Sequence, residues 1–190
     1  AQNDTSLPET SQCRALMPVG FPPNHQDDTS AAAAMTNKWC VVSCDIAVGE
    51  SDILQRLQKV CDATKKLKSK PTAYMQLLLQ NHVAPLLPES VARQTCLDVF
   101  SRHSLVLTNV PGPPEKCRLA GKVIDDVQMF FNNLITQTSL ISYGGNVYGN
   151  IVYDPEALPG LQEFGNLYGK AFVQLAERLD IDKPNELLKM

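Results

Sequence analysis

Apolar side chains recur every three or four residues in two long stretches of the chain, which is the spacing of one face of an α-helix. The first stretch, 51–69, opens with Ser51 and Asp52, whose side chains can cap a helix N-terminus, and Pro71 stops it. The second runs over about 161–179. We therefore predict two amphipathic helices. The apolar side of the second comprises Phe164, Leu167, Tyr168, Ala171, Phe172, Leu175 and Leu179.

Shorter apolar runs, rich in β-branched residues and bounded by Gly or Pro, predict strands. The pair Gly144 and Gly145 separates the last two runs. Two strands joined by such a pair indicate a β-hairpin, in which the glycines supply the positive φ of the turn. The predicted strands are 15–19, 39–48, 104–110, 138–143 and 146–153.

The segments between these runs complete the pattern. Residues 73–82 and 89–100 are predicted to be helical, with prolines interrupting the stretch between them. Residues 21–34 contain Pro, Asn, Asp and Ser and are predicted to form a loop, while the stretch around Phe130 is ambiguous. Because strands and helices are interspersed, we expect an α/β fold, a mixed β-sheet with flanking helices.

Composition narrows the classes of protein that fit. A chain of 190 residues with 44% hydrophobic and 19% charged residues can bury the core of one domain. The net charge of −3 gives no general attraction to phosphates, so no nucleic acid is expected as a partner. No apolar run approaches the roughly 20 residues of a membrane-spanning helix. The first residue is Ala and not Met, which favours a sequence that begins partway through a larger protein.

The usual motifs of catalysis and metal binding are missing from the sequence. It contains no HExxH, CxxC, GxSxG, Walker or GxGxxG pattern. The three histidines, His25, His82 and His103, are far apart, and we interpret each as structural. We therefore expect no metal site and assign no catalytic residue. The six cysteines are scattered, which favours free thiols in a reducing compartment.

Five short motifs follow one another in a distinctive order. They are RALMPV at 14–19, SLVLTNVPGP at 104–113, LAGK at 119–122, SYGGN at 142–146 and DPEALP at 154–159. This ordered set resembles the C-terminal domain of the wax ester synthase/diacylglycerol acyltransferase family. That family has an R-A-x-x-P-V strand, then an S/T-N-V-P-G-P turn, an LAG segment, a SYxG hairpin and a D-x-x-x-x-P exit. Each motif alone is common, but their order is specific.

The resemblance implies one lobe of the CoA-dependent acyltransferase fold, in which two similar α/β lobes enclose a channel. The expected divisions are a polar segment at 1–13, the C-terminal-type domain at 14–180 and a tail at 181–190. In the family, a histidine of an HHxxxDG motif in the first lobe deprotonates the hydroxyl of the acyl acceptor. This chain has no His-His pair, so a missing N-terminal lobe would supply the base.

The implied activity is transfer of a fatty acyl group to a long-chain alcohol or diacylglycerol, which is wax ester or triacylglycerol synthesis. Acyl-CoA would be the co-substrate, and no bound cofactor is expected. The implied location is cytoplasmic, with peripheral contact to the endoplasmic reticulum, the plasma membrane or a lipid droplet left open. A non-catalytic lobe that acts as a binding or interaction module is the alternative, because a lone lobe would expose the apolar surface meant for its partner.

Two interpretations of the matched residues stay open. In the first, Thr108, Asn109, Ser142 and Tyr143 face the channel and hydrogen-bond the substrate or the developing oxyanion. In the second, the motifs only shape turns. The lysines within 65–70 also have two interpretations, contact with CoA phosphates or an anionic membrane, or a solvated helix end. The structural turn residues are Pro111, Gly112, Pro113, Gly144 and Gly145.

Overall fold

A computed structural model describes most of the chain. The described residues are Pro8, 11–21 and 38–181. The loop predicted for 21–34 lies outside the described residues except for Phe21. Most of the polar segment 1–13 and of the tail 181–190 lies outside them as well.

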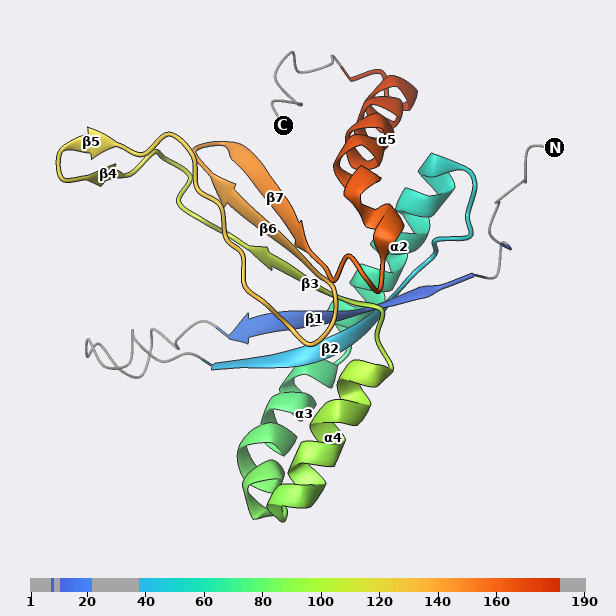
Figure 1. Cartoon of the computed structure of the whole chain (residues 1–190), viewed down its shortest axis with the longest axis vertical. Coiled ribbons are helices and arrows are strands. Elements are labelled where there is room, and N and C mark those ends of the chain that lie inside the picture. The colour runs from blue at the N-terminus through green and yellow to red at the C-terminus, as the bar shows by residue number, and fades with distance from the viewer. Residues whose placement is uncertain (1–7, 9–10, 22–37, 182–190) are drawn as a thin grey trace.

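A mixed five-stranded sheet forms the centre of the fold (Figure 1). Its strands are β1 (Cys13–Phe21), β2 (Lys38–Ile46), β3 (Leu105–Val110), β6 (Gln137–Tyr143) and β7 (Asn146–Val152). The spatial order is β2-β1-β3-β6-β7; β1, β3 and β6 run parallel, and β2 and β7 are antiparallel at the two edges. Each strand predicted from the sequence is confirmed, as is the hairpin of β6 and β7.

The predicted helices are present around this sheet. They are α2 (Ile53–Ser69), α3 (Thr72–Leu78), α4 (Glu89–Ser101) and α5 (Phe164–Arg178). The α-helix predicted over 73–82 ends earlier, at Leu78. The chain continues as a π-helical turn at Leu79–Val83 and a 3-10 turn at Ala84–Leu86. Pro85 lacks the backbone N–H that would continue the α-helical hydrogen bonds. A 3-10 turn at Pro159–Glu163 likewise precedes α5.

The helices lie on different sides of the sheet. In Figure 1, α2 and α5 lie together above it, and α3 and α4 lie below it. Both α2 and α3 contact the edge strand β2. An α/β arrangement with a mixed sheet and flanking helices is therefore confirmed.

The large apolar side chains of α5 are more exposed than its amphipathic spacing suggests. Its large side chains are substantially exposed, with Leu167 at 59%, Tyr168 at 48% and Phe172 at 43%. The buried residues of α5 are Gly169 and Ala176, because small side chains let a helix backbone approach its neighbours closely. Three aromatic rings follow one another along the helix, with centroids 6.0 Å apart for Phe164 and Tyr168 and 5.7 Å apart for Tyr168 and Phe172. We call Phe164, Leu167, Tyr168 and Phe172 the α5 stripe.

Two very short strands were not predicted. These are β4 (Arg118–Leu119) and β5 (Lys122–Val123), which pair as a separate two-stranded hairpin. Both residues of its turn, Ala120 and Gly121, have positive φ, at 50° and 81°. Figure 1 shows this hairpin projecting beyond the main sheet. Strands of two exposed residues have no buried face, so they leave no alternation in the sequence.

The ambiguous stretch around Phe130 belongs to an irregular segment, 124–136, that crosses one face of the sheet. Side chains from that face of β6 and β7 bind the segment by hydrogen bonds, and this replaces regular secondary structure. The bonds join Tyr143 Oη to Ile124 O at 2.9 Å, Tyr148 Oη to Asp126 Oδ1 at 2.8 Å, Asn150 Nδ2 to Met129 O at 2.5 Å and Asn133 Nδ2 to Gln137 Oε1 at 2.8 Å.

Asp52 caps α2 and also connects it to α5. Its Oδ1 accepts hydrogen bonds from the backbone N–H groups of Leu54 and Gln55 at 3.0 and 2.9 Å, and its Oδ2 pairs with Arg178 at 3.0 Å. The bond from Gln55, and after it the interaction with Arg178, lowers the pKa of Asp52 although partial burial opposes this. The carboxylate form is therefore favoured by folding.

A pH dependence follows from this lowered pKa. The contribution of Asp52 is present above its unfolded pKa, about 3.9, and is lost as the pH falls through the lower folded value. We expect Asp52→Ala to reduce the free energy of unfolding at pH 7, with a difference from wild type that shrinks below about pH 4. Asp52→Asn, which keeps a capping oxygen, should lose less. Urea unfolding at several pH values measures both, and a constant difference across the range would contradict the assignment.

Candidate functional site

The four residues predicted to face a channel project from both faces of the sheet. Thr108 pairs with Ser139, and Asn109 pairs with Leu140. Because side chains alternate along a strand, Thr108 shares a face with Tyr143, and Asn109 shares the opposite face with Ser142. A single channel on one face would therefore contact two of these side chains and not all four. The adjacency of the residues in each pair was the sequence signal for this arrangement.

Tyr143 is held in a structural position. Its side chain is 2% exposed, and its hydroxyl accepts a hydrogen bond from Cys117 N at 2.8 Å and donates one to Ile124 O at 2.9 Å. These two bonds close the base of the β4–β5 hairpin. Thr108 is also buried, at 6% exposure, whereas Asn109 is exposed. Asn109 is therefore the best placed of the four to meet a ligand from solvent.

The Pro-Gly-Pro turn packs directly against the β6–β7 hairpin. Gly112 N donates to Ser142 Oγ at 3.0 Å, and Gly144 N donates to Pro113 O at 3.1 Å. A Cβ on Gly112 would lie 2.1 Å from Ser142 O, so only glycine fits there. The hairpin glycines have φ of 56° at Gly144 and 85° at Gly145. The remaining turn residue, Pro111, follows β3.

The lysines at the end of α2 border a hollow of about 530 Å³ between that helix and β2. Lys66 and Lys70 line it, but so do Asp45 and Asp62. The carboxylates also have other cationic partners, since Asp45 pairs with Arg14 at 2.9 Å and Asp62 with Lys65 at 4.0 Å. The lysines within 65–70 are exposed at the end of α2, which is the arrangement that the solvated helix end predicts.

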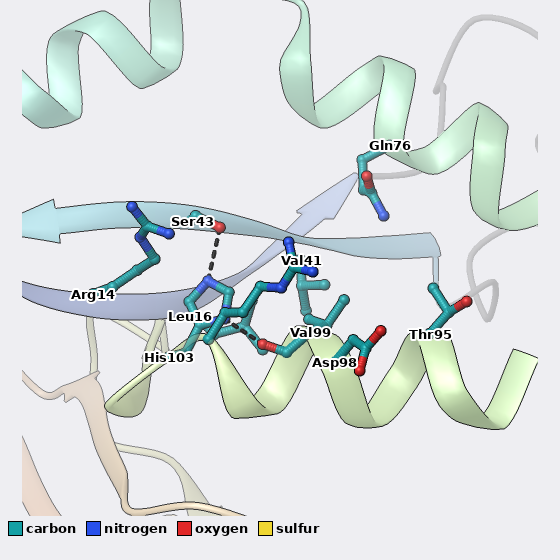
Figure 2. Close-up of a pocket in the computed structure, with 10 residues that line it drawn as sticks. Arg14, Leu16, Val41, Ser43, Gln76, Thr95, Asp98, Val99 and His103 are labelled. Atoms are coloured by element: carbon teal, nitrogen blue, oxygen red, sulfur yellow. Dashed lines mark hydrogen bonds between the residues drawn. The ribbon is translucent and has the colours of Figure 1, made fainter.

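A second hollow, of about 400 Å³, lies between β1, β2 and α4 and contains a group that the sequence did not reveal (Figure 2). Ser43 Oγ lies 2.7 Å from His103 Nε2, and His103 Nδ1 lies 2.5 Å from the backbone oxygen of Val99. Arg14 lines the same hollow. The serine and the histidine are 60 positions apart in the chain, and no motif marks either of them. The sequence predicts a structural role for His103, and the structure places its ring against the hydroxyl of Ser43.

The described residues contain neither a cluster of metal ligands nor a helix that could span a membrane. Among these residues, no group of three His, Cys, Asp or Glu side chains is placed to hold a metal ion. None of the helices in the described ranges combines the length and the apolar character of a bilayer span. All six cysteines are free, and burial raises the pKa of the Cys40 thiol.

Comparison with known proteins identifies the class. The family model described as the WS/DGAT C-terminal domain matches residues 35–176, so the chain belongs to this family, the C-terminal domains of wax ester synthases/diacylglycerol acyltransferases. A solved structure with a similar fold is the wax ester synthase/diacylglycerol acyltransferase from Marinobacter aquaeolei VT8, with a TM-score of 0.57 and 18% identity. The alignment covers 74% of this chain and 36% of that one, so the chain spans about a third of that protein. No curated protein matches the sequence.

Proposed function

We propose that this chain is the C-terminal lobe of an O-acyltransferase that moves a fatty acyl group from acyl-CoA to a long-chain alcohol or diacylglycerol. The observation that carries the proposal is the match of residues 35–176 to the C-terminal domain of this acyltransferase family. The fold shared with a wax ester synthase/diacylglycerol acyltransferase supports it. The lobe would be residues 14–180, and the products would be wax esters or triacylglycerols.

The chemistry of such a transfer assigns different tasks to two lobes. The acceptor hydroxyl must lose its proton to a base within hydrogen-bond reach as it attacks the thioester carbon, and the CoA thiolate leaves. The family's base belongs to an HHxxxDG motif, which this sequence does not contain. The lobe described here would contribute one wall of the channel, with exposed Asn109 as the residue placed to hydrogen-bond the acyl carbonyl or its oxyanion.

The decisive experiment compares residues 1–190 alone with the same residues joined to the region encoded upstream. Acyl-CoA consumption is measured with hexadecanol and with diacylglycerol as acceptors. We expect ester formation only when an upstream HHxxxDG lobe is present, and the Asn109→Ala variant of that longer protein should lose about tenfold or more in kcat. An upstream region without the motif would contradict the proposal. Ester formation by residues 1–190 alone, undiminished when all three histidines are replaced, would contradict it too.

A non-catalytic interaction module remains the second candidate, and the α5 stripe is the observation that favours it. Large exposed side chains such as Leu167 and Tyr168 form an apolar surface that another chain can cover. Replacing both with Glu would abolish association through this surface without removing a core contact. Size exclusion with light scattering measures the mass that separates the candidates. A mass above that of the monomer would support the interaction module, and a monomer with no bound partner would contradict it.

A further inference from the structure

The hydrogen bonds around His103 define which of its nitrogens carries the proton. The oxygen of Val99 is a backbone carbonyl and can only accept, so in the neutral ring Nδ1 must be the N–H that donates across the 2.5 Å contact. Nε2 then presents a lone pair. Ser43 Oγ, at 2.7 Å, must donate its proton to that lone pair. This is the orientation that a serine nucleophile and its general base require.

The positions of both residues follow from the fold. Ser43 lies on the edge strand β2, where its Cα partner is Leu16, and its side chain is exposed. His103 lies just beyond Arg102, the residue that caps the C-terminus of α4, and its ring turns back to the carbonyl of Val99 in the last turn of that helix. Figure 2 shows the ring lying between the helix and the strand, with both dashed hydrogen bonds. The helix end therefore orients the base, and the strand presents the hydroxyl to the hollow.

Arg14 supplies a positive charge beside this pair. Its Cα partner on β2 is Asp45, two residues from Ser43, so both side chains project from the same face of the sheet. Arg14 Nε donates to Asp45 Oδ1 at 2.9 Å, and among the described residues its two terminal nitrogens have no other partner. A guanidinium next to a nucleophilic hydroxyl can stabilise the oxyanion that forms when the hydroxyl attacks a carbonyl.

We propose that Ser43 and His103 form a nucleophile and base pair that accepts an acyl group from an activated ester or thioester. Ser43 Oγ bonds to the carbonyl carbon while its proton passes to His103 Nε2. The tetrahedral oxyanion lies beside Arg14 and collapses, the bond to the leaving alcohol or thiol breaks, and that group takes the proton from Nε2. Water then attacks the acyl carbon and loses a proton to Nε2; the bond from that carbon to Ser43 Oγ breaks, Oγ takes the proton from Nε2, and the carboxylic acid leaves. This activity is separate from the acyltransferase channel, because it needs no second lobe and no CoA.

A fluorophosphonate probe tests the serine directly on residues 1–190. Oγ displaces fluoride from phosphorus, and intact mass with peptide mapping locates the adduct. We expect labelling at Ser43 in the wild type, no adduct there in Ser43→Ala, and labelling at least about 100-fold slower in His103→Gln. Hydrolysis of p-nitrophenyl butyrate should fall in parallel. Arg14→Gln, which keeps the base but removes the charge, should slow hydrolysis while leaving the fold intact by circular dichroism.

Ser104→Ala is the matched control, since Ser104 is an exposed serine next to His103 and has no place in the mechanism. Its labelling and hydrolysis should equal those of wild type. Equal probe incorporation in wild type and Ser43→Ala, or an adduct on another serine, would overturn the proposal. Ser43 is exposed on an edge strand, so its replacement decides the question even if His103→Gln does not fold. An inert Ser43 would leave the two-lobe acyltransferase experiment unaffected, because that assay measures acyl-CoA consumption with an added acceptor.

Discussion

Gly112→Ala is expected to lower the free energy of unfolding by about 3 kcal/mol, a large fraction of the stability of a domain this size. The added methyl group would lie 2.1 Å from the backbone oxygen of Ser142 and 3.3 Å from its carbonyl carbon. Both atoms belong to a paired strand, so neither can move without opening the β6–β7 ladder. The displacement would also break the 3.0 Å bond from Gly112 N to Ser142 Oγ.

Gly160→Ala is the control for this change. A methyl group on Gly160 meets nothing within 4 Å, so the same substitution there should change the free energy of unfolding by less than about 0.5 kcal/mol. Urea unfolding followed by far-ultraviolet circular dichroism measures both variants. If Gly112→Ala is as stable as Gly160→Ala, the turn does not pack against β6 as closely as the structure shows. The tested contact is also the one that joins the Pro-Gly-Pro motif to Ser142.

Elements with a strong local pattern could be predicted from the sequence. The apolar run at 104–110, which ends at Pro111, is β3, and the Gly-Gly pair between two runs is the turn of the β6–β7 hairpin. Asp52 was recognised as a capping residue and does cap α2. In each of these cases the information lies within a few neighbouring residues, because caps, turns and strand alternation are local.

Features that depend on tertiary packing could not be predicted. Amphipathic spacing predicts that the large residues of α5 share one side of the helix. The residues of α5 that are buried, however, are Gly169 and Ala176. The Ser43 and His103 contact depends on how α4 lies against β2, and no pattern in the sequence encodes that distance. Packing decides both outcomes, so they become visible only in the assembled fold.

The irregular segment 124–136 could be predicted only in part. It has no helical or strand period, yet it covers a face of the sheet and is held by side chains that alternation along β6 and β7 directs to that face. The same face includes Thr108 and Tyr143, two of the residues predicted for a channel. Thr108 is buried on this face, whereas Asn109, on the opposite face, is exposed and is the more accessible of the two.

Gln137 is expected to be the side chain that matters most for holding this segment. It is 0% exposed, accepts a hydrogen bond from Asn133 at 2.8 Å and donates one to Ser139 Oγ at 3.2 Å. Gln137→Ala should cost about 3 kcal/mol of unfolding free energy, because it opens a cavity and leaves the buried Ser139 hydroxyl with one partner fewer. Gln137→Met keeps the volume and loses only the polar contacts, so about 1–2 kcal/mol is expected.

The difference between these two variants separates packing from hydrogen bonding at one position. Asn133→Ala is the third variant, and it should cost less than about 1 kcal/mol because Asn133 is exposed and water can replace it at Gln137. Urea unfolding gives the three values, and hydrogen exchange at residues 124–136 reports whether the segment has come away from the sheet. Gln137→Met as costly as Gln137→Ala would mean that the polar contacts, and not the filled volume, hold the segment. A wild-type value for all three would show that the segment does not depend on Gln137.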